Sequence, residues 1–327
     1  MLLILLYSLV QGDCDVRFWQ QLHGPTRHHR VRHRFSPASH NAGLYASAVS
    51  RHFGTQLVVA HAFTMVQAAR EAEVLTSKPS MQRRDLDHDL ALQAEILDAG
   101  QGETEAVLLP GDPRTTIPEL ARRRHPSLLV VGTHGGGSIG RFVLGSTAEG
   151  ILRNSSGAAL TIGPKVDILQ AGTLKIQRIL YATDCSREAA HAAPVAVALA
   201  EAFGAEFDVL NIVHSRQIDR SELMRNIEQH FHEAAESYLQ QGAEQVTKPH
   251  SFVCAGDPAE QILLHIEEHR IDLLVLGLRR SAHLGMQNRT SGAFAIIVAA
   301  SCPVVTVAEG STATSSPERH SASQEAS

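Results

Sequence analysis

A glycine-rich segment near the middle of the chain has the composition of an anion-binding loop. The apolar run Leu128–Val131 leads into Gly132-Thr-His-Gly-Gly-Gly-Ser-Ile-Gly-Arg-Phe-Val-Leu-Gly145-Ser146-Thr147, and a helical pattern resumes at Ala148. Glycines let the backbone approach a ligand closely, and the unbonded N–H groups at a helix start favour an anion. The segment predicts a phosphate site, although glycines also end strands and form tight turns without any ligand.

The other residues whose side chains could act in catalysis or bind a metal form no recognisable pattern. No Walker lysine follows the glycines, and Ser, His and Asp are too scattered to indicate a catalytic triad. No pair of carboxylates has a metal-binding spacing, and the cysteines form neither a Cys-x-x-Cys pair nor the spacing of a zinc site. We therefore expect reduced thiols, no catalytic residue and no metal. The four cysteines are Cys14, Cys185, Cys254 and Cys302.

Length and composition indicate a globular protein of two domains. The chain has 327 residues, of which 43% are hydrophobic and 19% charged. A formal charge of -5 and an aromatic content of 5% give no reason to expect a nucleic-acid partner. The apolar opening Met1–Val10 lacks a basic start and a small-residue cleavage site, and it is too short to span a bilayer. We expect a cytoplasmic protein with no membrane contact.

An internal repeat divides the chain into two similar units. Ser36 and Ser186 begin matching segments 150 positions apart, each leading to a Phe-Gly pair and an apolar run. Further on, Gly-Asp-Pro at 111–113 matches Gly-Asp-Pro at 256–258, 145 positions later, and Ala159–Ile162 matches Val304–Val307 at the same interval. Order and spacing are both preserved, so the two units should share one fold.

Each unit alternates short β-rich runs with longer helical patterns. This alternation predicts right-handed βαβ crossovers and a doubly wound, mainly parallel sheet. In the second unit we expect an N-cap at Asp257 with Pro258 in the first helical turn. The strands expected there are 176–183, 207–213, 251–255, 271–277 and 302–307, and the helices are 187–203, about 219–241 and 258–269. The expected segments are an atypical start (1–35), unit 1 (36–164), unit 2 (172–309) and a polar, disordered tail (310–327), with a linker at 164–172.

These motifs together resemble the universal stress protein family. Gly132-x-x-Gly135, nine residues and Gly145-Ser146 are similar to the nucleotide motif of its ATP-binding branch. Gly-Asp-Pro, Leu-Val-Val-Gly-Thr-His-Gly and Ala-Thr-Asp-Cys-Ser are similar to other motifs of that family, and the resemblance covers about 36–163 and 175–308. It implies an α/β fold of the adenine nucleotide alpha hydrolase type with strand order 3-2-1-4-5.

The resemblance also implies an adenine nucleotide, ATP or AMP, between the first and fourth strands, with any Mg²⁺ carried by the nucleotide. The phosphates would lie on the loop of unit 1, and an Asp after the first strand would contact the adenosine; by position that Asp is Asp184, in unit 2 only. His61 and His134 are candidates for phosphate or base contacts, or for ordinary loop hydrogen bonds. The loop residues are Gly132, Thr133, His134, Gly135, Gly145, Ser146 and Thr147.

Unit 1 departs from the family pattern at its first strand. At the interval of 150, Arg178–Asp184 corresponds to His28–Arg34, a basic run that cannot occupy the centre of a sheet. Leu2–Val10 could fill the place, but its return to Ser36 would need about 25 residues, longer than compact domains usually have. We therefore expect the first strand to be missing or replaced, with a wrong start or frameshift upstream of Ser36. The basic segment His23–Arg34 is expected to be a mobile tail, with a nucleic-acid or metal-binding arm as the alternative.

Unit 2 departs from the pattern at the phosphate loop. Arg280 and Thr290 replace two glycines there, so we expect no ATP in this unit. A basic cluster in the loop could hold an anion by its side chains, or it could be a solvated surface. The cluster comprises Arg279, Arg280, His283 and Arg289.

The sequence favours a stress-response binding module that senses or stores adenine nucleotide and acts through protein contacts. One alternative is a slow ATP hydrolase or phosphotransferase that uses the same loop. Another is a nucleotide-free scaffold in which terminal strands pair. Ala159–Ile162 would pair with Val304–Val307, between the units of one chain or in a homodimer.

Overall fold

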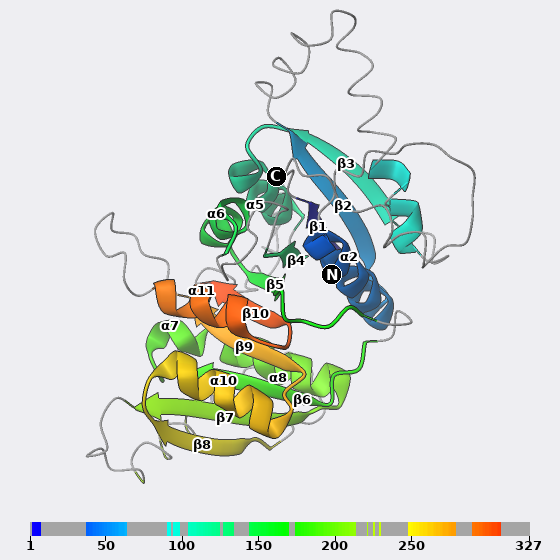
Figure 1. Ribbon diagram of the computed structural model, residues 1–327. Coiled ribbons are helices and arrows are strands. Elements are labelled where there is room, and N and C mark those ends of the chain that lie inside the picture. The colour runs from blue at the N-terminus through cyan, green and yellow to red at the C-terminus, as the bar shows by residue number, and fades with distance from the viewer. Residues whose placement is uncertain are drawn as a thin grey trace, which may run out of the picture.

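The computed structural model describes most of both repeats (Figure 1). The described residues are 2–7, 37–63, 90–92, 94–98, 104–124, 127–133, 144–169, 174–213, 221, 225, 229, 248–278 and 290–308. The expected helix at about 219–241, the basic segment at 23–34 and the tail from 310 lie outside them, apart from three isolated helical positions. No helix among the described residues is long and apolar enough to cross a membrane.

Strands and helices alternate in both units, as the sequence predicts. Unit 1 contains β1 Leu2–Tyr7, α2 Pro37–Phe53, β2 Gln56–Phe63, β3 Thr104–Pro110, α5 Pro113–Arg123, β4 Ser127–Gly132, α6 Ser146–Asn154 and β5 Ala158–Ile162. Unit 2 contains β6 Arg178–Thr183, α7 Arg187–Ala190, α8 Ala193–Phe203, β7 Glu206–Val213, β8 His250–Ala255, α10 Pro258–His269, β9 Leu273–Leu278, α11 Thr290–Ala299 and β10 Val304–Ala308.

The described strands form one ten-stranded sheet that runs through both units. Its order is β3-β2-β1-β4-β5-β10-β9-β6-β7-β8, so each half has the expected order 3-2-1-4-5. Strands within each half are parallel, whereas β5 and β10 pair antiparallel in the middle, with Val305 opposite Leu160. The predicted pairing of the terminal strands is therefore made within one chain. A homodimer through these strands would need the edges that this pairing occupies.

The first strand of unit 1 is replaced rather than missing. Leu2–Tyr7 pairs in parallel with β2 on one side and β4 on the other, in the central place of the half-sheet. Our preference against this placement because of its long return connection was wrong. The entropic cost of closing a loop rises only slowly with its length, whereas a central strand gains two hydrogen-bonded neighbours and apolar burial. The basic run 28–34 lies outside the described residues.

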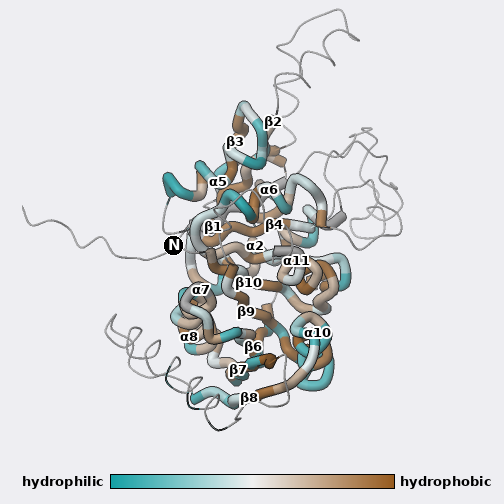
Figure 2. Tube along the Cα trace, turned by 90° about the vertical axis from the view of Figure 1, so that its left-hand side faces the viewer, coloured by the Kyte–Doolittle hydropathy of each residue, from teal (hydrophilic) through white to brown (hydrophobic). Residues whose placement is uncertain are grey.

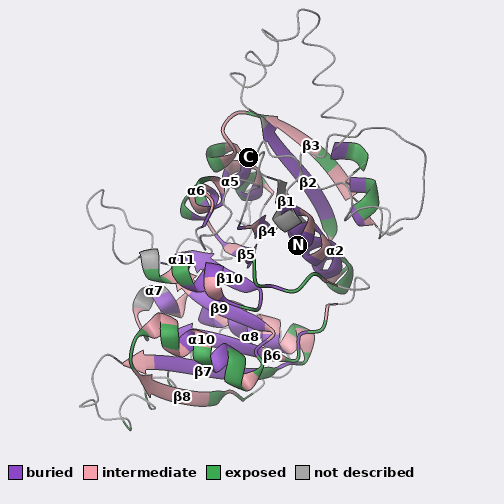
Figure 3. Ribbon diagram, in the orientation of Figure 1, coloured by how far each residue is buried: buried purple, intermediate pink, exposed green. Residues whose placement is uncertain are grey.

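Two hydrophobic cores cover the faces of the sheet, and each core extends through both units. Residues alternate between the faces along each strand, so that Val59 faces α2 while Val58 faces the other layer. On one face α2 and α8 pack against the sheet, and on the other face α5, α6, α10 and α11 do so. Hydrophobic positions follow the strands through the interior, and exposed positions lie mainly on the outer faces of helices (Figures 2 and 3). The cores do not divide at the boundary between the repeats.

The helix ends follow the predicted local signals. Asp257 caps α10 by accepting a hydrogen bond from the Glu260 backbone N–H at 3.1 Å, and Gly204 ends α8 in a left-handed conformation with φ 59°. The helix expected over 187–203 is divided in two by a turn at 191–192. Pro194 accounts for this break, because it has no N–H to donate to the Ala190 carbonyl and its ring crowds that carbonyl.

Contacts between the units reinforce the strand pairing. The ring of His52 at the end of α2 stacks on Phe203 of α8, with ring centroids 4.4 Å apart. The expected linker packs on unit 1, where Val166 is buried and Asn41 donates to the Val166 carbonyl at 3.3 Å. Burial raises the pKa of Tyr45 to about 12, and its hydroxyl donates to the Asp167 carbonyl at 3.3 Å. The linker is therefore part of the folded body over its described residues.

Gly163 provides a test of this joint. It follows β5, and an added Cβ would lie 2.9 Å from the backbone oxygen of Ile297 in α11. Gly163→Ala should lower the free energy of unfolding by about 1–3 kcal/mol, because neither backbone can move without disturbing the other unit. Gly292→Ala is the matched control, since its Cβ would meet nothing within 4 Å. Urea unfolding measures both variants, and equal midpoints for Gly163→Ala and the parent would contradict the close approach.

Candidate functional site

The expected phosphate loop begins where a crevice is expected at the carboxyl end of the sheet in unit 1. β1 lies between β2 and β4, and its neighbours are reached by connections that lead away in opposite directions along the sheet. Ligands of doubly wound sheets bind at this switch point, outside the carboxyl ends of the strands. Gly132 ends β4 there.

The base of the loop is closed by Thr133. Its backbone N–H and hydroxyl both donate to the Ile162 carbonyl, at 3.1 and 3.3 Å, and its own carbonyl accepts from the Gly145 N–H at 2.9 Å. Thr133 is fully buried, so its side chain anchors the loop instead of facing a ligand. Residues 134–143, which include His134 and Gly135, lie outside the described residues. The structure brings the two ends of the loop together.

The α6 helix starts at the far end of this loop and points its first turn at the crevice side of β4. It begins at Ser146, two residues before the expected position, and Gly145 is its N-cap. Gly145 provides no side-chain cap at this end, and the positive end of the helix dipole favours an anion beside the first-turn N–H groups. Gly145 has a steric reason to be glycine, because a Cβ would lie 3.1 Å from the Thr133 oxygen. Ser146 is exposed and Thr147 is half-buried, so Gly132, Gly145, Ser146 and Thr147 lie around one loop closure.

Asp184 lies in the turn that follows β6, the first strand of unit 2. Its carboxylate accepts a hydrogen bond from the Ser186 N–H at 3.0 Å, and Cys185 between them has a positive φ of 56°. The buried Asn211 side chain fixes this turn by donating to the Thr183 carbonyl at 3.0 Å. Asp184 is exposed at the carboxyl end of β6, where the family resemblance requires a carboxylate. Gly277 lies on β9 nearby in the sheet order, while 279–289, with the basic cluster, lie outside the described residues.

Strand register shows which residue of unit 1 corresponds to Asp184. Tyr7 is aligned with His61, and Thr183 with Asn211, so Tyr7 and Thr183 occupy equivalent positions. The next residue in unit 1 is Ser8, which lies outside the described residues, where unit 2 has Asp184. His61 is 2% exposed and occupies the place of Asn211, which holds the turn in unit 2. Sequence reasoning singled out His61 but missed Asn211, because its role depends on strand register.

The two half-sites cannot combine into one complete site. Because β5 and β10 run antiparallel, the strands of the two half-sheets point in opposite directions, and their carboxyl ends lie at opposite ends of the continuous sheet. The loop closure at Gly145 and the turn at Asp184 therefore lie at opposite ends. Each unit must bind a ligand with its own residues.

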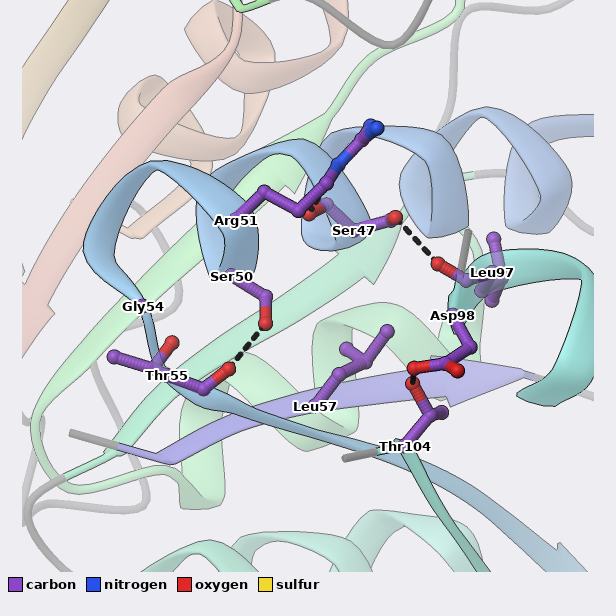
Figure 4. A pocket seen from close by; sticks show the side chains of 9 residues that line it. All are labelled: Ser47, Ser50, Arg51, Gly54, Thr55, Leu57, Leu97, Asp98 and Thr104. Carbon is purple, nitrogen blue, oxygen red and sulfur yellow. Dashed lines mark hydrogen bonds between the residues drawn. The ribbon is translucent and has the colours of Figure 1, made fainter. Parts of the chain in front are cut away.

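A separate pocket of about 250 Å³ lies at the other end of unit 1, near the amino end of β2 (Figure 4). Its walls are largely polar. The hydroxyls of Ser47 and Ser50 donate to backbone carbonyls, and Thr104 Oγ1 donates to Asp98 Oδ1 at 2.8 Å, whereas the buried Thr55 hydroxyl has no partner among the described residues. Ser47 donates to the Leu97 carbonyl across it at 2.5 Å. This end is opposite to the one at which parallel sheets bind ligands, so the pocket does not belong to the predicted site.

The strand order of each half defines a tandem α/β protein with two doubly wound units. Residues 33–162 and 175–308 both match the universal stress protein family, and the chain belongs to that family. No curated protein sequence matches the chain.

Solved structures of universal stress proteins are similar to this chain. One from Archaeoglobus fulgidus DSM 4304 is 19% identical, with a TM-score of 0.58 over 84% of this chain and 96% of that chain. Two that resemble a single unit are an Archaeoglobus fulgidus protein in complex with dAMP (17% identity, TM-score 0.30, 42% of this chain and 98% of that chain) and a protein in complex with cAMP (20%, 0.31, 41% and 98%). At these identities the first likeness supports the fold, and no ligand is transferred from it.

Asn211 is predicted to be the residue that holds the Asp184 turn in place. Asn211→Ala removes its buried hydrogen bonds to the Thr183 carbonyl and to the Cys185 sulfur, the latter at 3.3 Å. We expect a loss of about 1–3 kcal/mol in the free energy of unfolding. Burial raises the pKa of the Cys185 thiol, an effect that the Asn211 hydrogen bond partly offsets, so labelling should be slow in the parent; in the variant the turn opens, and greater exposure of the sulfur should make labelling faster. Peptide-resolved thiol labelling measures this, with exposed Asn154→Ala as the control; an unchanged Cys185 rate would refute the assignment.

Proposed function

We propose that unit 1 binds an adenine nucleotide, ATP or AMP, and that the protein is a stress-response binding module acting through protein contacts. Any Mg²⁺ would enter with the nucleotide. The observation that carries this proposal is the start of α6, where an uncapped first turn follows a glycine packed directly on the end of the loop. Location in the cytoplasm stays a prediction.

The phosphate end of the proposed site is supported by backbone geometry. The hydrogen bond from Gly145 N–H to the Thr133 carbonyl holds the α6 terminus beside the end of β4, and we propose that Gly132, Ser146 and Thr147 contact the phosphates there. Backbone N–H groups at a helix start bind phosphate without a lysine. The roles of His134 and Gly135 stay predictions.

The adenosine end of the proposed site is weaker in unit 1. A charged carboxylate forms hydrogen bonds roughly twice as strong as those of a neutral group, and Ser8 offers only a hydroxyl at that place. The two nucleotides named for similar structures, dAMP and cAMP, are ligands of those proteins. For this chain we propose modest nucleotide affinity in unit 1 and no ATP in unit 2.

A calorimetric titration of the full chain with ATP and with AMP tests the proposal. We expect one nucleotide per chain, and Gly145→Ala should weaken binding more than about tenfold, since the new Cβ displaces the loop end from Thr133. Gly292→Ala, at the equivalent helix of unit 2, should leave affinity unchanged. If neither nucleotide gives binding heat or a thermal shift, the proposal is wrong and the nucleotide-free scaffold is favoured.

Ser8→Asp is predicted to strengthen nucleotide binding by about tenfold, because it restores a charged acceptor in the register of Asp184. Asp184→Ser in unit 2 is the matched control and should leave binding in unit 1 unchanged. If Asp184→Ser abolishes binding while Ser8→Asp has no effect, the nucleotide occupies unit 2 and the assignment to unit 1 is wrong.

Single-turnover phosphate release separates the binding module from a slow hydrolase or phosphotransferase. Around the described part of the crevice, the carboxylate in the first turns of α6 is Glu149, which pairs with Arg153 at 2.6 Å. We therefore expect bound ATP to persist unhydrolysed for many hours. Phosphate release in a single turnover that is faster than the spontaneous hydrolysis of free ATP would favour the hydrolase or phosphotransferase.

A further inference from the structure

A buried carboxylate in unit 2 plays no part in the proposed nucleotide site. Asp208 lies on β7 beneath α10 and is 1% exposed, among apolar side chains of the second core. An ionised carboxylate in such surroundings costs several kcal/mol unless positive or hydrogen-bonding partners compensate it. Its surroundings should therefore explain why the charge is there.

Two imidazoles bind the two oxygens of this carboxylate. His265 Nε2 of α10 lies 3.2 Å from Oδ2, and His250 Nδ1 of β8 lies 3.2 Å from Oδ1. Burial raises the pKa of Asp208, but the hydrogen bonds of His265 and His250, together with the charge of Arg178, outweigh it and lower that pKa overall. The carboxylate is accordingly ionised at neutral pH.

A third imidazole completes the cluster without touching the carboxylate in a hydrogen bond. His269 lies one turn after His265 on α10, and the two rings stack with centroids 4.0 Å apart and 14° between their planes. One ligand atom each from Asp208, His265 and His269 lie within 4.8 Å of one another. Phe252 of β8 contacts both imidazoles edge-on, at 4.7 and 5.0 Å between centroids, and forms an apolar wall.

The repeat provides an internal control for what the fold requires at this place. The interval of 150 positions sets Val58 against Asp208, and the strand register agrees. The interval of 145 positions sets Leu120 and Arg124 against His265 and His269. Glu105 stands where unit 2 has His250, and it pairs with Arg124 at 2.5 Å. In unit 1 the equivalent helix, α5, therefore packs on the equivalent strands with the apolar Val58 in place of Asp208 and with the Glu105–Arg124 ion pair nearer the surface. The fold does not need a buried carboxylate and three imidazoles.

We propose that Asp208, His265 and His269 form a binding site for a divalent transition metal of the zinc type. Two imidazole nitrogens and one carboxylate oxygen are a donor set that Zn²⁺ favours, with a fourth position open to water. Tetrahedral bonds of about 2.1 Å set ligand atoms about 3.4 Å apart, so on binding the separations of up to 4.8 Å shorten by as much as about 1.4 Å and the stacked rings turn toward the metal. His250 keeps its contact with Oδ1 and orients the carboxylate as an outer partner.

The neighbouring charges are compatible with a cation at this position. The charge of Arg178 acts on Asp208, but Arg178 is held by Glu206 and by the His269 carbonyl, which accepts from Arg178 Nη1 at 3.1 Å. Asp208 supplies one negative charge for the metal, and the two neutral imidazoles supply none.

The test uses the full chain, stripped of metal and titrated with Zn²⁺ against a chromophoric chelator, with Co²⁺ as the spectroscopic probe. We expect tight uptake at this site and the ligand-field bands of four-coordinate Co²⁺. His269→Phe keeps the ring stack but removes the nitrogen, and should weaken affinity by more than the roughly 10–100-fold typical of an outer partner. The loss of Zn²⁺ affinity in His250→Gln should fall within that range of about 10–100-fold.

Two controls keep the proposal falsifiable. The basic N-terminal segment also contains histidines, so a variant with His28, His29 and His33 changed to Asn should retain the tight site. Replacing Asp208, His250, His265 and His269 by the unit 1 residues Val, Glu, Leu and Arg should fold and bind no Co²⁺ in four-coordinate form. Zn²⁺ should raise the thermal midpoint of the parent but not of His269→Phe. Equal affinities for the parent and His269→Phe, or no uptake by the parent, would overturn the proposal.

Discussion

The antiparallel pairing of β5 with β10 is the constraint on which the rest of the molecule depends. Each strand would otherwise be the apolar outer edge of a parallel half-sheet, and exposed edges of this kind promote aggregation. Their pairing removes both edges and carries the two hydrophobic cores across the repeat boundary, since Leu160 and Val305 belong to one core and Ala159 and Val304 to the other. Because of the same pairing, the carboxyl ends of the strands in the two units lie at opposite ends of the sheet.

Most of the fold could be predicted from the sequence, because the repeat supplies two independent copies of one pattern. Apolar runs, the Gly-Asp-Pro helix starts and Gly204 all fall where local chemistry requires them. The position of β1 could not be predicted by alignment, since it lies 176 positions before its equivalent, Leu2 before Arg178, instead of 150. Strand pairing selects an apolar segment wherever it occurs, and a long connection adds little to the cost.

The candidate site was predictable in type but not in every role. Gly145 and Ser146 lie at a helix start, as their sequence context indicates, because glycine and hydroxyl residues after a buried strand have few other uses. Thr133 looked like a ligand contact but anchors the loop through Ile162, a residue 29 positions away. Its role, like that of Asn211 beside Asp184, depends on which strand ends lie together, and no local pattern records that.

Duplication explains how both units could diverge and yet persist. A half that loses part of a ligand site still supplies one strand of the central pair and half of each core, so its fold continues to stabilise its partner. Selection on the fold then leaves the residues at the carboxyl ends, and those beneath α10, free to change separately. Unit 1 keeps the glycine loop and an ion pair between Glu105 and Arg124, whereas unit 2 keeps Asp184 and places a charged cluster at the equivalent of that pair. The two units therefore differ at the strand ends, in the segment that supplies the first strand and beneath α10, while both halves keep the same strand order.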